Sequence, residues 1–346
     1  MAEEDSDEEA LRARERVTGS TSMQDVDESD LASGRGRSAR WPNAIPARGL
    51  LDVVWRVYRR IVEDQLGLIA AGVTFYAILG LFPAIVALVS IYGLLTDAST
   101  LQEQLKWMSG YLPQEALGLI SSELERITTV RGGSLGFAAL ISIGLALWSV
   151  NTAVLAVFKA LNVAYGESET RSLLRLYATG FAVTIGIIVC SILVVNGIVV
   201  MPVVLLALGI GQGVELIMRL AMAPLFFLLM AAAASVLYRI GPSRRDARWR
   251  WISVGSVVFA SVWIAVALGL SYYLSRFADY TATYGSLGAA IGLMLWIYAA
   301  VYIFLAGAEL NSELEHQTAR DTTIGPDRPM GERKAHVADT LGALRS

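Results

Sequence analysis

The side chains best placed to do chemistry in this sequence are a carboxylate and several amides inside apolar runs. Glu309 lies in the run 286–310, two residues before Asn311, and Asn151 and Asn196 lie in two other runs. Ionisable groups in such surroundings are costly and commonly bind protons, ions or polar substrates. We expect Glu309 to accept a proton or cation, or to anchor a polar headgroup. The alternative is a structural hydrogen bond to a neighbouring helix.

Further charges lie at the ends of the apolar runs. Lys159 could pair with Glu309, and Asp64 could cap the first apolar helix or pair with an arginine of the loop 239–250. Buried amides need partners, so Asn151 and Asn196 could instead hold helices together. The candidate substrate pathway is Glu309, Asn311, Asn151, Asn196 and Lys159, and the candidate inner-face charges are Asp64, Arg244, Arg245 and Arg248.

The residue inventory argues against an enzyme. Both histidines, His316 and His336, are in the C-terminal tail and twenty residues apart, so neither a metal cluster nor a His-based acid–base pair for a nuclease is expected. The single cysteine, Cys190, excludes an internal disulfide and a Cys-based zinc site. No lysine is followed by Ser or Thr, which excludes a Walker A loop. We expect no catalytic residues, no metal and no cofactor.

Composition indicates an integral membrane protein. The chain is 55% hydrophobic and 17% charged, with a mean hydropathy of +0.53, unlike an ordinary soluble domain. Its 28 basic and 31 acidic residues give no basic surface for nucleic acid. The first long apolar run begins only at Leu66, so no secretory signal is expected.

Six apolar runs are long enough to cross a bilayer as helices, and none alternates like a strand. They are 66–95, 134–158, 176–201, 214–237, 252–274 and 286–310. The predicted fold is therefore all-α, a polytopic bundle of six transmembrane helices. Arginines precede the first run and follow the second and fourth, which places both termini in the cytoplasm.

Proline and glycine residues indicate where these helices could break or pack closely. Pro83, Pro202 and Pro224 are candidate helix breaks of the kind that line transporter cavities, although proline also occurs in passive spans. Candidate close-packing positions are Gly288 and Gly292 in the last run, extended by Gly285 just before it.

The segments outside the bundle carry two amphipathic patterns. In the first exterior loop, Leu117, Ile120, Leu124 and Ile127 predict an extra amphipathic helix, either interfacial or a lid. Before the first span, residues 48–65 predict a juxtamembrane helix whose arginines contact anionic lipid or only set topology. Residues 1–40, with eleven acidic and six basic residues, predict disorder. The expected segments are a disordered cytoplasmic tail (1–47), the juxtamembrane helix (48–65), the six-helix domain (66–311) and a mostly disordered cytoplasmic tail (312–346).

Several runs resemble the YihY/BrkB family of bacterial inner-membrane proteins, formerly labelled ribonuclease BN-like. The resemblance covers about residues 50–315 and rests on Asp64 with the run 70–83 (AAGVTFYAILGLFP), on 148–149 (WS) with 158–166 (FKALNVAYG), and on 284–289 (YGSLGA), 295–298 (LWIY) and 307–311 (GAELN). One departure is ISVG at 252–255, where the family more often has proline before the glycine. The resemblance implies six membrane helices and a transport-like role, without a substrate.

Two functional hypotheses follow. The first is a transporter or flippase in the bacterial cell membrane for a lipid-linked, amphiphilic or small polar substrate. The second is a non-transporting scaffold or envelope-integrity protein. The expected partners are membrane lipids and no nucleic acid, and the sequence predicts no oligomeric state.

Overall fold

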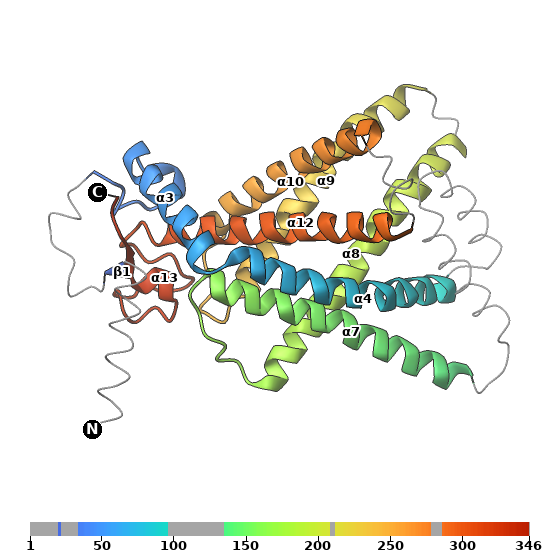
Figure 1. The fold of residues 1–346 in the computed structure, drawn as a ribbon, viewed down its shortest axis with the longest axis horizontal. Helices are drawn as coiled ribbons and strands as arrows, with labels where there is room; N and C mark the ends of the chain where they lie inside the picture. Colours follow the sequence, from blue (N-terminus) through green and yellow to red (C-terminus); the bar gives the residue numbers. More distant parts are fainter. Residues whose placement is uncertain (1–19, 22–33, 96–134, 208–211, 278–285, 346) are drawn as a thin grey trace. The chain divides into compact units, whose positions relative to one another are not determined.

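The computed structural model describes residues 20–21, 34–95, 135–207, 212–277 and 286–345 (Figure 1). It describes the side chains of residues 34–81, 83, 144–192, 224–269 and 291–345. The elements are β1 (Ser20–Thr21), the 3-10 helix η2 (Pro42–Ala44), α3 (Ala47–Glu63), α4 (Leu66–Leu95), α7 (Leu135–Ala164), α8 (Leu173–Ala207), α9 (Gln212–Ile240), α10 (Trp249–Phe277), α12 (Ser286–Glu315), α13 (His336–Asp339) and β2 (Leu341–Gly342).

The predicted all-α class is confirmed. Within the described residues the only paired strands are β1 and β2, two residues each, which pair antiparallel. Helices are the expected outcome for long apolar runs, because every backbone group is then bonded within its own segment.

The described part of the chain has four helices long and apolar enough to cross a membrane. A bent pair, α3 with the start of α4, raises that number to five, and Pro224–Ile240 is a shorter apolar helix. Each of the six predicted spans overlaps one long helix: α4, α7, α8, α9, α10 or α12. The count of six spans itself stays a prediction.

The described residues form two compact units. The first draws on residues 1–72, 158–170 and 224–346, and the second on 73–157 and 171–223. In the second unit, Trp148 of α7 stacks on Tyr177 of α8 with ring centroids 5.5 Å apart. The candidate functional site lies in the first unit.

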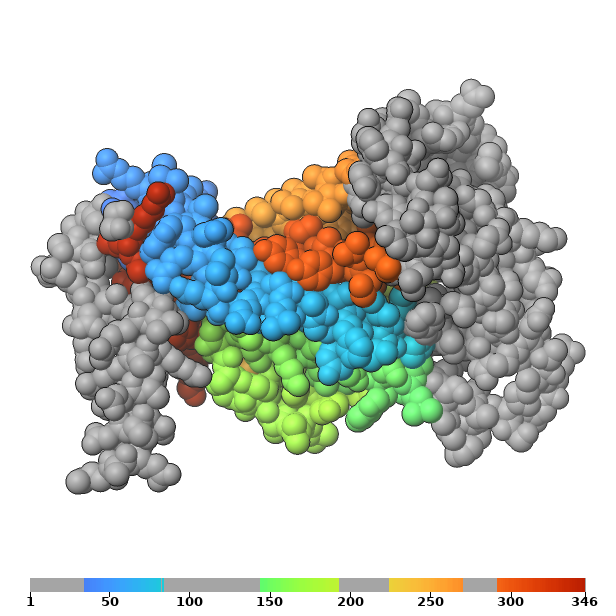
Figure 2. All heavy atoms as spheres, viewed as in Figure 1, coloured from blue at the N-terminus to red at the C-terminus, as the bar shows by residue number. Residues whose placement is uncertain are grey.

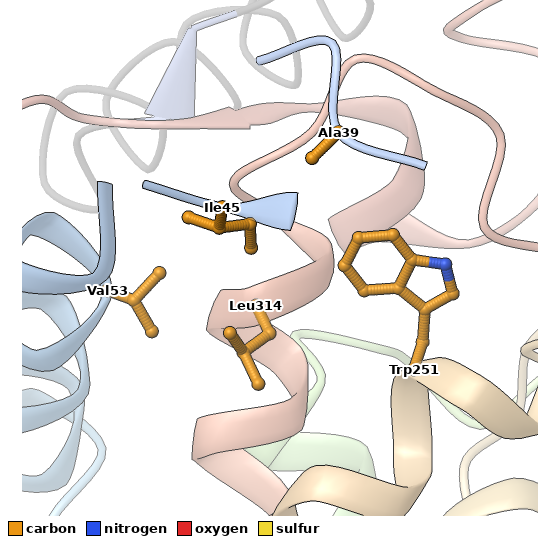
Figure 3. Packing of buried hydrophobic residues seen from close by; sticks show 5 residues of the cluster. All are labelled: Ala39, Ile45, Val53, Trp251 and Leu314. Atoms are coloured by element: carbon orange, nitrogen blue, oxygen red, sulfur yellow. The ribbon is translucent and has the colours of Figure 1, made fainter. Parts of the chain in front are cut away.

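In the first unit, α10 and α12 lie side by side, and α3 contacts α12 (Figure 1). At the C-terminal end of α12, Ile45 and Val53 meet Trp251 of α10 and Leu314 of α12, with Ala39 beside them (Figure 3). Each of these side chains is at most 6% exposed. This small core fixes α3 and the segment before it against the last turn of α12.

A glycine pair allows α10 and α12 to approach closely. A Cβ on Gly307 would stand 2.8 Å from the carbonyl oxygen of Gly255 and 2.6 Å from the Tyr238 hydroxyl oxygen. A Cβ on Gly255 would overlap the Gly307 carbonyl. The two helices therefore pack backbone to backbone, a geometry that only small residues permit.

The amphipathic α3 is turned with its polar side toward the protein. Asp52 and Arg56 are 1% and 4% exposed, whereas Val54, Tyr58 and Val62 are 61%, 70% and 61% exposed. In water such a helix would face the other way, so this orientation suits an apolar surrounding. Figure 2 shows the surface of this region, with the C-terminal segment beside it.

The end of the N-terminal tail and the C-terminal tail are more ordered than expected. Residues 34–47 supply Ala39 and Ile45 to the core, and Thr318, Thr322 and Thr323 are fully buried. Polar contacts hold the C-terminal segment: Arg333 donates hydrogen bonds to the backbone carbonyls of Ala319, Arg320, Arg328 and Ala338. Composition predicts disorder from the lack of apolar residues, and it does not register order built from such contacts.

Two of the three candidate helix breaks lie inside continuous helices, Pro83 in α4 and Pro224 in α9. Pro202 lies within α8. A Cβ on Gly292 would meet open space among the described atoms. Gly288 lies in α12, with its surroundings outside the described side chains. Gly285 and the predicted exterior amphipathic helix lie outside the described residues.

Candidate functional site

A buried polar cluster lies at the end of the first unit where α3 meets the last turns of α12. It gathers the last two turns of α12, the end of α3, the residues after α7 and the loop between α9 and α10. Five side chains in it, Glu309, Glu313, Glu315, Arg56 and Asn311, are at most 4% exposed. Charged groups are rarely buried this completely unless they are paired.

Glu313 is the paired carboxylate of the cluster. The Arg56 Nε atom donates a short hydrogen bond to its Oε2, and Arg60 Nε stands 3.5 Å from Oε1. Arg56 also donates to the Glu313 carbonyl at 3.1 Å and to the Gln317 side chain at 2.8 Å. These contacts hold α3 against the end of α12.

Glu309 lies one turn earlier on α12 and is only 1% exposed. No N–H or hydroxyl group of the described residues donates a hydrogen bond to either of its carboxyl oxygens. Its charged neighbours are Asp64, Glu313 and Arg60. Asp64, the residue that ends α3, is close enough for a hydrogen bond between the two carboxyl groups.

A second buried ion pair flanks the cluster. Arg244 Nη2 donates to both carboxylate oxygens of Glu315 at 2.8 Å, and both side chains are at most 1% exposed. The guanidinium lies 4.8 Å from the ring centroid of Tyr165. Burial and the nearby Glu315 raise the pKa of Tyr165 well above its usual value, so its hydroxyl stays neutral.

Asn311 joins α12 to the start of α10. Its amide nitrogen donates to the Ile252 carbonyl at 2.9 Å, and its side-chain oxygen accepts from the Gly255 N–H at 2.7 Å. These bonds lie beside the Gly255–Gly307 contact, so Asn311 stabilises the packing of α12 against α10.

The remaining pathway candidates are placed differently. Lys159 is exposed, whereas Glu309 is buried, and no ion pair joins them in the described structure. Asn151, in the second unit, is 1% exposed, and neither polar atom of its amide has a hydrogen-bond partner among the described residues. It packs directly against Gly180 of α8. Asn196 lies in α8, and its side chain falls outside the description.

The candidate inner-face arginines bind the C-terminal segment. Arg245 stands 3.9 Å from Asp321, and Arg248 donates to Asp327 at 2.6 Å and to the Thr323 carbonyl at 2.8 Å. Asp327 is largely exposed, so that ion pair adds little stability by itself. Asp64, the fourth candidate, has Arg60 at 4.0 Å as its ion-pair partner.

The two histidines are neighbours in space, which their spacing in the sequence does not suggest. Their ring centroids are 6.3 Å apart. Burial lowers the pKa of His316, and burial together with His316 lowers the pKa of His336 to about 4. His316 Nε2 is bonded to the Thr340 hydroxyl at 2.8 Å. Both rings are therefore neutral at physiological pH, so neither is a ready general acid for phosphodiester cleavage. No group of three metal-ligating side chains occurs among the described residues.

Glu167 makes the C-terminal segment sensitive to pH. Its carboxylate accepts a hydrogen bond from the His336 N–H at 2.7 Å, and burial raises its pKa from 4.5 to about 7. The unfolded state releases this proton first, so the stabilising contribution is full below about pH 4.5 and is lost as the pH rises through 7. His336 acts oppositely, with stability lost as the pH falls from 6.5 through about 4. Between pH 5 and 8 these two trends largely cancel in the wild type, so the contribution of Glu167 is measured against Glu167→Gln. Relative to that variant, we expect amide hydrogen exchange around residues 333–342, corrected for intrinsic rates, to accelerate at least about tenfold over this range.

Glu167→Gln is the control for this prediction, because it keeps the size of the side chain and removes its titration. In this variant the histidines still titrate, so its exchange should slow as the pH rises over the same range. Equal pH dependence in both proteins would show that Glu167 is not the group responsible.

Sequence reasoning found Glu309, Asn311, Asp64 and Arg244 but missed the partners that organise them. The missed residues are Arg56, Arg60, Glu313, Glu315 and Gln317. A signal was present, because Glu309 and Glu313 are four residues apart, as are Arg56 and Arg60, so each pair shares one helix face.

The fold and the site define a class: an α-helical, multi-pass membrane protein with a buried carboxyl cluster at the C-terminal end of α12. The model of the virulence factor BrkB family matches residues 57–331, and the chain belongs to this family.

Individual relatives agree with this assignment. The chain is 29% identical over 252 residues to the ribonuclease-like protein YfkH of Bacillus subtilis, covering 71% of this chain and 88% of that one. It is 30% identical over 264 residues to a UPF0761 membrane protein of Ralstonia nicotianae, covering 74% and 57%. A UPF0761 membrane protein of Delftia acidovorans is 26% identical over 262 residues, covering 74% and 60%. The chain thus spans less than two thirds of these UPF0761 relatives. No solved structure matches significantly.

Proposed function

We propose that this chain is a transporter or flippase of the bacterial cell membrane for a lipid-linked, amphiphilic or small polar substrate. The observation that carries the proposal is Glu309, a carboxyl group buried in an apolar helix with no hydrogen-bond donor among the described residues. Structural carboxylates are normally satisfied, as Glu313 is, and an unsatisfied one is typical of a site that binds something.

The proposal includes six membrane spans with both termini in the cytoplasm. It is supported by six long helices that overlap the predicted ranges and by the arginines between α9 and α10. With membrane lipids as its surroundings, the outward apolar face of α3 would lie in the inner leaflet.

We further propose that the chain is not an enzyme. The ribonuclease-like name belongs to the Bacillus relative. Burial lowers the pKa of both histidines here, so neither is charged at physiological pH.

The scaffold hypothesis is the second candidate. It is favoured by the C-terminal segment, which polar contacts fasten to the end of the bundle and which could present a fixed surface to a partner protein.

Reconstitution tests transport directly. Transbilayer movement of labelled phospholipid and of a lipid-linked sugar would be measured in proteoliposomes, with and without a proton gradient, for the wild type and Glu309→Gln. We expect movement with the wild type and a loss of about tenfold or more in the variant, because Gln keeps the shape but cannot bind a proton.

Glu63→Gln is the matched control, since Glu63 is a partly exposed carboxylate near the same helix end and pairs only with Arg59 in the described structure. It should retain wild-type movement. Equal movement in wild type and Glu309→Gln would remove Glu309 from the mechanism, and no movement with either cargo would favour the scaffold hypothesis.

A further inference from the structure

Glu309 and Asp64 come from different helices and lie within hydrogen-bonding reach of one another. Two ionised carboxylates have only acceptor atoms, so they cannot form a hydrogen bond. The contact becomes favourable when one of the two carries a proton. Glu309 is the more buried partner, at 1% exposure, whereas the Asp64 side chain is 20% exposed and stands beside Arg60.

The surrounding charges leave Glu309 without a counter-ion of its own. From α3, Arg56 is bonded to Glu313, and Arg60 stands 3.5 Å from Glu313 and 4.0 Å from Asp64. On α12 itself the nearest charge is the carboxylate of Glu313. Among the described residues of α3 and α12, two arginines therefore face the three carboxyl groups of Asp64, Glu309 and Glu313.

Among the described residues, the other elements near Glu309 contribute the hydroxyl groups of two tyrosines. Tyr165, after α7, lies near both Asn311 and Glu309. Tyr238 of α9 donates its hydroxyl to the Phe304 carbonyl at 2.6 Å. An ionised Glu309 would thus be a buried charge with no hydrogen-bond donor among the described residues, which is unfavourable, whereas a protonated one is neutral.

We propose that Asp64 and Glu309 form a proton-binding pair, in which Glu309 carries the proton and donates a hydrogen bond to the Asp64 carboxylate. The ligand of this site is the proton itself, exchanged with the cytoplasmic side through the less buried Asp64. Glu313, one turn away on the same helix, is the ionised counterpart, since two arginines neutralise it.

The pair sits at the bend between two helices. Asp64 ends α3, Gln65 adopts a left-handed conformation with φ of +49°, and α3 and the first part of α4 make an angle of 62°. Loss of the shared proton would place two like charges side by side at this bend and favour its opening. That coupling of proton release to movement rests on the proposed transport function, whereas proton binding does not depend on it.

Carbodiimide labelling tests the pair without any transport measurement. Dicyclohexylcarbodiimide enters apolar regions and modifies protonated carboxyl groups, and mass spectrometry locates the adduct. The full chain in proteoliposomes should be labelled at Glu309 at neutral pH, with labelling falling at least about tenfold at alkaline pH. Glu313 is an internal comparison of equal burial on the same helix and should stay unlabelled, since its charge is neutralised.

Three variants complete the experiment. Glu309→Gln should lose the adduct and weaken the infrared carbonyl band of protonated carboxylic acids, while Glu63→Gln should leave both unchanged. Asp64→Asn should reduce labelling of Glu309 at neutral pH, because the ionised acceptor that favours its protonated form is gone. Folding of each variant is checked by its elution profile and melting temperature.

The outcomes separate clearly. No adduct at Glu309 in a folded wild type at any pH, or equal labelling of Glu309 and Glu313, would overturn proton binding at this site. Unchanged labelling in Asp64→Asn would overturn the shared pair. Protection by sodium at constant pH would identify a metal-cation site and so contradict the proposal. A labelled Glu309 in a chain that moves no cargo would reject the transport function and leave the proton site standing.

Discussion

Gly255→Val is expected to destabilise the protein by at least about 3 kcal/mol, because the new side chain would overlap the Gly307 carbonyl and the Asn311 amide. Neither neighbour can yield easily. The carbonyl is backbone, and the amide already bonds α10 through Ile252. Thermal unfolding in detergent and the yield of monodisperse protein would measure the effect.

Gly292→Val is the matched control, since Gly292 lies on the same helix as Gly307 but its Cβ would meet open space among the described atoms. It should change the melting temperature little. If both variants were equally stable, the close approach of α10 and α12 would not exist in solution.

Arg56→Ala carries the second large effect, about 3–5 kcal/mol, since it leaves the buried Glu313 carboxylate without its closest partner. The variant also loses the bonds of Arg56 to Gln317 and to the Ala343 carbonyl. We expect a lower melting temperature and faster hydrogen exchange in both α3 and the C-terminal segment.

Arg59→Ala, three residues further along α3, is the control. Arg59 is 37% exposed in its side chain and pairs with Glu63 at helical spacing, so its loss should cost about 0.5 kcal/mol or less. The double variant Arg56→Leu with Glu313→Leu should recover much of the stability, because removing both charges removes the unpaired one. No recovery would indicate that Arg56 acts mainly through its backbone contacts.

Periodicity and hydropathy predicted the all-α class and the positions of the long helices, because burial in lipid demands long uninterrupted apolar runs. They also singled out Glu309, whose charge stands out against such a run. What they could not supply was the pairing. Asp64 and Glu309 lie at opposite ends of the apolar domain in sequence, and a single sequence does not show which distant side chains meet.

The orientation of α3 was beyond sequence reasoning for a related reason. The spacing of Val54, Tyr58 and the arginines shows that two faces exist, but the choice of the inward face depends on whether water or lipid lies outside. The order of the C-terminal segment was not predicted, because it comes from groups such as Arg333 and Asp339. Their contacts with the backbone leave no periodic pattern in the sequence.

The ties between α3 and the C-terminal segment also set an order of assembly. Arg56 is synthesised 257 residues before Glu313 and 287 residues before Ala343. Earlier segments fold first during synthesis. The polar side of α3 therefore stays without these partners until α12 has been inserted. A chain interrupted after α10 would keep that side exposed, and such a chain would be a ready substrate for membrane quality-control proteases.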